Sequence, residues 1–256
     1  MNTGIYKDGT EINDLEDWRV RAGPKSAIQW KDGRSAKESA KSWLATNQIP
    51  PELLEPINGH PDFDTIEKWN AEPEAPVRID EFRGEPPNID VLLRARDQRG
   101  PIAIVVEAKA DESFGALVTD TIKDADKRLL DSPKSKGRER LERLSMSLFN
   151  RAPTDELVQG LRYQLLTASG AALAEAERIK ANRAVVLVHE FVSSLTEASK
   201  RQSNYDDYLR FLAALGSSEE PSGLVGPFEV PGAPIVGEKI KLYLGKAASD
   251  VRASGV

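Results

Sequence analysis

Two acids and a lysine near the middle of the chain have the residue types and the spacing of a site that cleaves phosphodiester bonds. Glu107 and Lys109 are two positions apart, so that on a β-strand both side chains leave the same face. Asp90 lies in the preceding segment, and all three residues adjoin strongly apolar runs. Because an unpaired charge beside such runs is costly, we expect these side chains to meet and to neutralise one another.

The chemistry that this combination allows is metal-assisted hydrolysis. Mg²⁺ prefers oxygen ligands, and we expect Asp90, Glu107 and the backbone carbonyl of Ala108 to hold Mg²⁺ (or Mn²⁺). Such an ion activates a water molecule and polarises the phosphate. Lys109 would orient or deprotonate that water and offset the charge that develops on phosphorus. The alternative for these residues is an ordinary cross-strand ion pair at the end of a sheet.

The composition favours this choice of metal. The chain has no cysteine and only two histidines, so thiolate sites are excluded and zinc would lack its usual ligands. A metal would therefore be held mainly by oxygen, which indicates magnesium or manganese.

A β-hairpin must position the three residues. Ile89–Arg96 is rich in branched residues, Asp97–Gly100 has the composition of a turn, and Ile102–Val106 is a continuous apolar run. Such a run is typical of a strand buried on both faces. A hairpin centred on this turn places Asp90 opposite Glu107, with their Cβ atoms roughly 4.5–5.5 Å apart.

Helical and extended patterns account for most of the remaining chain. Ser35 is expected to cap a helix that ends near Asn47, with Glu38 completing a capping box. The other predicted helices are Glu52–Ile57, the interrupted segment 120–148, Thr154–Asn182 and Tyr205–Leu215. The other predicted strands are Val77–Arg83, Ala184–Val188 and Lys239–Leu244, while 59–76 and the first thirty residues are expected to be irregular.

This order of elements predicts an α/β fold in which helices flank a mixed central sheet on both faces. We expect one domain over residues 1–256. Its core would span about 35–192, with a helical insertion at about 111–152 and a C-terminal extension at about 204–256.

The hairpin also carries a resemblance to a known family. Ile89-Asp90, followed by Glu107-Ala108-Lys109 at the end of a buried strand, resembles the PD-(D/E)XK nuclease superfamily, although Ile89 stands where the family name has proline. The inferred elements are similar to its core of helix, three strands, helix and strand. The stretches Val106–Gly115, Leu161–Leu166 and Leu187–His189 also resemble an uncharacterised bacterial family grouped with these nucleases.

The resemblance implies a restriction-endonuclease-like core and metal-dependent cleavage of nucleic acid, with DNA as the expected substrate. Relatives often place a glutamine or a basic residue on the helix after the E-x-K strand, which makes Gln164 a candidate catalytic residue beside Asp90, Glu107 and Lys109. Some relatives carry an additional acid on the first helix or strand. Glu38 and Glu81 are candidates for that acid, although a capping role also explains Glu38.

The charge distribution bears on the partner. The net charge of −6 counts against non-specific coating of nucleic acid, but 123–143 is locally basic. The residues expected to contact phosphates are Lys134, Lys136, Arg138, Arg140 and Arg162. A solvated helix face with ion pairs four residues apart is an equal alternative for the basic segment.

The remaining expectations concern location and assembly. No apolar run is long enough to cross a membrane, and the N-terminus lacks the pattern of a secretory signal, so a cytoplasmic protein without membrane partners is predicted. A homodimer is one expectation, because many restriction-like enzymes dimerise to cut both strands. Two other functions stay open: a non-catalytic nucleic-acid-binding or assembly protein on the same fold, and a small-molecule phosphodiesterase.

Overall fold

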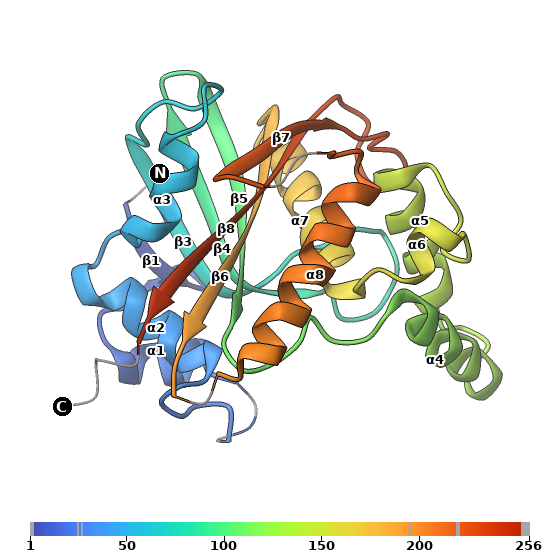
Figure 1. Ribbon diagram of the computed structural model, residues 1–256, viewed down its shortest axis with the longest axis horizontal. Coiled ribbons are helices and arrows are strands. Elements are labelled where there is room, and N and C mark those ends of the chain that lie inside the picture. Colours follow the sequence, from blue (N-terminus) through green and yellow to red (C-terminus); the bar gives the residue numbers. More distant parts are fainter. Residues whose placement is uncertain (1–2, 25, 27, 195, 219–220, 252–256) are drawn as a thin grey trace.

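One mixed β-sheet runs through the protein, as the computed structural model shows for residues 3–24, 26, 28–194, 196–218 and 221–251 (Figure 1). Its eight strands within these ranges lie in the order β2-β1-β3-β4-β5-β6-β8-β7. Their bounds are β1 (Gly4–Lys7), β2 (Thr10–Glu11), β3 (Lys68–Pro76), β4 (Asn88–Asp97), β5 (Gly100–Lys109), β6 (Arg183–Val192), β7 (Leu224–Glu229) and β8 (Lys241–Asp250). The predicted domain limits, residues 1 and 256, lie outside the described ranges.

Helices cover both faces of the sheet. The helices are α1 (Leu15–Ala22), α2 (Ser35–Thr46), α3 (Pro51–Asn58), α4 (Val118–Asp131), α5 (Gly137–Phe149), α6 (Glu156–Gln159), α7 (Tyr163–Arg178) and α8 (Ala198–Ala214). The first three lie on one side, α5 to α8 lie on the other, and α4 projects away from the sheet (Figure 1). The α/β class with a helix-flanked mixed sheet is therefore confirmed.

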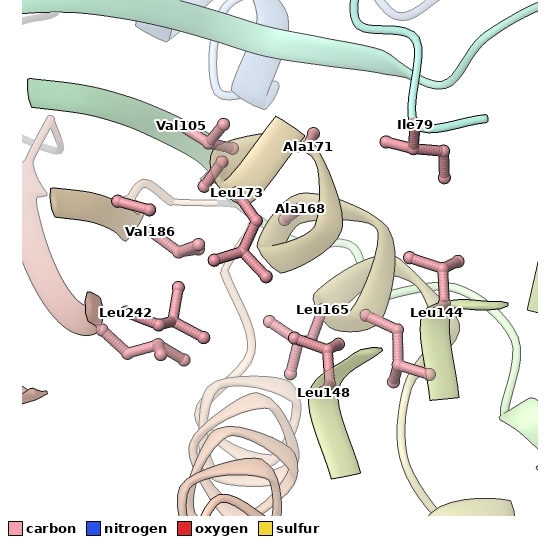
Figure 2. Close-up of a cluster of buried hydrophobic side chains, with 14 of the residues drawn as sticks. Ile79, Val105, Leu144, Leu148, Leu165, Ala168, Ala171, Leu173, Val186 and Leu242 are labelled. Atoms are coloured by element: carbon pink, nitrogen blue, oxygen red, sulfur yellow. The ribbon is translucent and has the colours of Figure 1, made fainter. Parts of the chain in front are cut away.

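The central strands are buried on both faces, as their apolar runs predict. In β5, Ile102, Ile104 and Val106 pack in the core on the side of α1, α2 and α3, whereas Ala103 and Val105 pack on the side of α7. Figure 2 shows this second core, where Val105 and Val186 of the sheet lie beside the α7 residues. The small side chains of α7 let this helix lie close to the sheet, and its first turn reaches the end of β5.

The β4–β5 hairpin has the predicted register. Asp97 pairs with Gly100 across a two-residue turn, and Val91 pairs with Val106 at the other end. The same register continues to place Asp90 opposite Glu107. β6 then pairs with β5 in parallel, after a connection that contains α4 to α7, so the ends of β5 and β6 meet at one edge of the sheet.

The strand predicted at Val77–Arg83 is wrong, because the strand lies one segment earlier, at β3. Alternate residues of β3 are buried, which is the period of a half-buried strand. Pro73, which cannot donate a ladder hydrogen bond, obscured this pattern in the sequence. It is tolerated because the neighbouring strand β1 pairs with β3 only at Asn70 and Ala71.

The helix predicted over Thr154–Asn182 is also wrong in extent, because it divides into α6 and α7. Backbone bonds from Val118 N to Leu161 O and from Tyr163 N to Ala116 O, 2.8 and 3.0 Å long, take the place of helical bonds there. Gln164 consequently lies in the first turn of α7 rather than in the middle of a longer helix.

The predicted capping box of α2 is wrong in detail. Arg34 is the N-cap residue, and Ser35 is the first residue of the helix. The Glu38 carboxylate instead accepts a 2.7 Å hydrogen bond from Gly33 N. The helices predicted at α2 and α3 and the strand at β6 are confirmed. α8 and β8 are confirmed in type and place, but α8 begins at Ala198 instead of Tyr205 and β8 continues to Asp250 instead of ending at Leu244. α1, β1, β2 and β7 were not predicted.

Candidate active site

A cavity of about 300 Å³ lies at the carboxyl end of β5. Its walls come from the start of α2, from the three strands β3, β4 and β5, from the loop after β5 and from the start of α7. The lining residues that carry polar side chains are Gln29, Arg34, Ser35, Glu74, Asp90, Lys109, Glu112, Ser113 and Gln164. The cavity therefore lies where the two helical layers meet the edge of the sheet.

Asp90 and Glu107 come together as the hairpin register requires. The Asp90 carboxylate accepts a 2.7 Å hydrogen bond from the backbone N–H of Ala108, which fixes its position beside the E-x-K segment. Glu107 is buried, with 2% of its surface exposed. Burial, followed by the charge of Asp90, raises the pKa of Glu107 to about 8. The register thus places two acids in an environment that disfavours two negative charges.

Lys109 supplies the compensating charge. Its Nζ donates to Glu107 Oε1 at 2.7 Å and to the Ala108 carbonyl at 3.2 Å. Only 4% of the residue is exposed, and Nζ lies 5.4 Å from the centre of the Phe114 ring. Burial opposes the charge of this lysine, but the carboxylates of Glu107 and Asp90 outweigh burial and raise the pKa of Lys109. The ammonium therefore stays charged beside Glu107.

Gln164 also reaches the cluster. It projects from the first turn of α7, and its Nε2 donates to Glu107 Oε1. The same carboxylate oxygen thus receives hydrogen bonds from Gln164 and from Lys109, which orients the carboxyl group from two sides. All four predicted catalytic residues, Asp90, Glu107, Lys109 and Gln164, are brought together.

Glu74 is an acid of this cavity that the sequence prediction missed. The register pairs Pro73 with Val91 and Ala75 with Ile89, so Glu74 lies opposite Asp90. Its backbone has a φ of +47°, which is strained for a residue with a side chain, and Lys7 Nζ holds its carbonyl oxygen at 2.7 Å.

The Glu74 carboxylate faces the cavity and makes no hydrogen bond or ion pair within the described ranges. Burial and then the charge of Asp90 raise the pKa of Glu74 to about 7, although Lys7 opposes this shift. The β3–β4 register is what places Glu74 in the site. The sequence prediction missed this residue because β3 was not recognised as a strand.

The two acids proposed as additional site residues do not line this cavity. Glu38 accepts hydrogen bonds from Gly33 N and from Lys41 Nζ, at 2.7 and 3.1 Å, which gives it a structural role at the start of α2. Glu81 pairs with Arg143 at 2.5 Å, outside the cavity.

The donor atoms of the cluster fit a hard divalent cation. Asp90, Glu107 and the Ala108 carbonyl offer oxygen only, as Mg²⁺ and Mn²⁺ prefer. Among the residues that the structure describes, no three Asp, Glu or His side chains are grouped closely enough to hold one ion together. An ion at this position would therefore be completed by the carbonyl and by water, which is usual for magnesium.

Most of the residues predicted to contact phosphate lie away from the cavity and are already paired. The pairs are Lys136 with Glu139 at 2.5 Å, Arg138 with Asp126 at 3.1 Å and Glu142 at 3.2 Å, and Arg140 with Asp80 at 2.6 Å. Lys134 precedes α5 and is exposed. These contacts agree with the alternative of a solvated, ion-paired helix face.

Arg162 is the member of that predicted set nearest to the cavity. Its guanidinium donates to Asp207 at 2.6 Å and to the carbonyl of Gly115, a lining residue, at 2.7 Å. It therefore supports the wall of the cavity.

Comparison with known proteins gives a family for this α/β chain. A family model described as Domain of unknown function (DUF6946) matches residues 11–251, and the chain belongs to that family. No curated protein and no solved structure matches the chain. Within the described ranges, no helix has the length and the apolar character that crossing a bilayer requires.

Proposed function

We propose that this chain hydrolyses phosphodiester bonds in nucleic acid, with DNA as the substrate and with Mg²⁺ or Mn²⁺ as the cofactor. The observation that carries the proposal is the meeting of Asp90, Glu107 and Lys109 at the end of the β4–β5 hairpin, beside a cavity that Asp90 and Lys109 line. Gln164, on the helix where the resemblance to PD-(D/E)XK nucleases expects it, bonds to the same Glu107.

The arrangement of the elements supports a restriction-endonuclease-like core. A helix, three strands, a helix and a strand follow one another as α3, β3, β4, β5, α7 and β6, once α4 to α6 are set aside as an insertion. The four strands are adjacent in the sheet, and only β4 runs antiparallel to the other three. This is the order of elements that the resemblance implies.

Each residue has a role that follows from its position. Asp90, Glu107 and the Ala108 carbonyl would hold the ion, which supplies Lewis-acid stabilisation of charge on the phosphate. Lys109 is charged and close to both carboxylates, so it can orient the attacking water and stabilise the negative charge that develops at phosphorus. Gln164 orients Glu107 by its hydrogen bond.

The test is a cleavage assay on linear duplex, single-stranded and supercoiled DNA, with Mg²⁺, Mn²⁺ or EDTA. Asp90→Ala and Lys109→Ala should each lower the rate by roughly 100-fold or more, because each removes an interaction with the reacting groups. Asp120→Ala and Lys123→Ala are matched controls, since these residues form an exposed ion pair on α4, 3.0 Å apart, and should leave the rate unchanged.

The competing functions give different results. A non-catalytic binding or assembly protein would cleave none of these substrates in any metal and would bind Mn²⁺ no better than Asp90→Ala does. A small-molecule phosphodiesterase would hydrolyse bis(p-nitrophenyl) phosphate without inhibition by added DNA. Either result would overturn the proposal.

A further inference from the structure

Among the described residues that line the cavity, positive charge that is not paired with Glu107 lies on one side only. Of the charged residues that line it, Glu74, Asp90 and Glu112 are acids, and Lys109 is committed to Glu107. The one other cation among the lining residues of the described chain is Arg34, at the start of α2. If a substrate with several phosphates binds in this cavity, Arg34 is therefore the lining residue that can balance the charge of a second phosphate.

The guanidinium of Arg34 has donors to spare. Its Nη1 donates to both carboxylate oxygens of Asp111, at 2.8 and 2.7 Å. In the part of the chain that the structure describes, its Nε and Nη2 make no hydrogen bond. The side chain is 39% exposed. Arg34 can thus bind an anion with its free edge, or exchange Asp111 for the anion altogether.

The first turn of α2 adds backbone donors at the same place. Arg34 is the N-cap residue of this twelve-residue helix, and its side chain makes no capping hydrogen bond to the described residues. Ser35 and Ala36, the first two helical residues, line the cavity, and backbone N–H groups at these positions have no acceptor within a helix. The helix dipole and these N–H groups favour an anion in front of them.

A buried hydroxyl group that lacks a partner in the described chain is a second, independent feature at this place. A small chamber of about 30 Å³ adjoins the cavity, and the two share Ser35, Ala36, Glu74, Asp90 and Ala108 as lining residues. Ser39 also lines this chamber. It is 3% exposed, and its hydroxyl has no hydrogen-bond partner among the described residues. A volume of this size holds about one water molecule or one oxygen atom of a ligand.

We infer that Arg34 and the first turn of α2 form a phosphate-binding subsite, which holds a phosphate of the nucleic-acid strand next to the one that is cleaved. The identity of the ligand rests on the proposed function, but the subsite binds phosphate without the metal and without catalysis. Without substrate, Asp111 occupies the guanidinium and shields it from the acids of the cavity. Arg34 is therefore a substrate-positioning residue, and Asp111 competes with the substrate for it.

Substitutions of Arg34 and of Asp111 should change the affinity for nucleic acid in opposite directions. In EDTA, the affinity for a fluorescein-labelled single strand of about 12 nucleotides, followed by anisotropy, should fall about tenfold in Arg34→Ala and less in Arg34→Lys. Asp111→Asn should bind roughly threefold more tightly, because a competing negative charge is gone. Arg151→Ala, which removes an exposed arginine paired with Asp155 at 3.0 Å, is the control and should bind like the parent.

The salt dependence gives a readout that a purely structural role would not change. Loss of one phosphate contact should lower the slope of log affinity against log salt by about 0.7 in Arg34→Ala. Pyrophosphate should compete with the strand in the parent and not in this variant. The inference is overturned if the parent binds neither ligand, or if both substitutions only lower the melting temperature and leave affinity and slope unchanged.

The subsite and the nuclease activity can fail separately. If no metal supports cleavage while Arg34→Ala weakens binding and Asp111→Asn strengthens it, the subsite stands and the proposed function falls. If the parent cleaves DNA and Arg34→Ala leaves KM and kcat unchanged, the proposed function stands and the subsite falls.

Discussion

Raising the pH should destabilise the protein through Glu107. Burial and the charge of Asp90 raise the pKa of Glu107 from its ordinary 4.5 to about 8. Between these values the folded chain binds a proton that the unfolded chain has released, so the free energy of unfolding falls as pH rises. At 1.36 kcal/mol per pH unit, the loss across this window is on the order of several kcal/mol. Stability from this group is complete below about pH 4.5 and is lost by about pH 8.

The assay compares urea unfolding of the parent and of Glu107→Gln from about pH 5 to about pH 8. The glutamine keeps an acceptor for Lys109 but cannot ionise, so the variant lacks this part of the pH dependence. Glu74, whose pKa is raised to about 7, contributes a similar slope to both proteins and cancels in the difference. Relative to the parent, the variant should therefore gain stability over the range, on the order of several kcal/mol.

Parallel curves for the parent and the variant would refute this reasoning. They would mean that Lys109 neutralises Glu107 fully and that the carboxyl group titrates as in the unfolded chain. Glu139→Gln serves as the control, because Glu139 is about half exposed and pairs with Lys136 on the surface. It should leave the pH dependence as it is.

Two further substitutions test single contacts. Gln164→Leu removes the donor to Glu107 and should lower the affinity for Mn²⁺, measured by calorimetry, roughly 10- to 100-fold. Gln202→Leu, which removes an exposed 2.8 Å contact on α8, is the control and should leave the affinity unchanged. Equal affinities of the two variants for Mn²⁺ would contradict an orienting role of Gln164. The Arg183 guanidinium bonds both carboxylate oxygens of the buried Asp97, at 2.6 and 2.7 Å. Arg183→Met leaves that carboxylate buried without its guanidinium partner and should lower the free energy of unfolding in urea by about 3–5 kcal/mol. A decrease of less than about 1 kcal/mol would contradict this prediction.

The hairpin could be predicted from the sequence because its determinants are local. The turn at Asp97–Gly100 and the two apolar runs on either side define a register, and the register places Asp90 opposite Glu107. The E-x-K spacing then places Lys109 on the same face as Glu107. These three positions follow from the two-residue period of a strand and require no knowledge of the rest of the fold.

Features that depend on distant partners could not be predicted. The break before α7 arises because Leu117 and Arg162 form a β-bridge, which joins two segments far apart in the chain. Glu74 was missed because its alignment with Asp90 depends on β3, whose alternation is obscured by proline. Arg34 gave no signal in the sequence, since only the fold brings the start of α2 to the end of β5.

The acids at the cavity link the pH dependence of stability to metal binding. Glu74, Asp90 and Glu107 lie in one row across three adjacent strands. Within the described ranges, Lys109 is the one cation that bonds to a carboxylate of any of them, because Lys7 bonds only the backbone carbonyl of Glu74. A structural ion pair would need one acid, and the two others would only weaken it. The excess negative charge must be met either by protons, as the pKa values of about 7 and about 8 indicate, or by a divalent cation. If Mg²⁺ binds Glu107, it must displace that proton, so the metal should remove the pH-dependent loss of stability in the parent and have no such effect in Glu107→Gln.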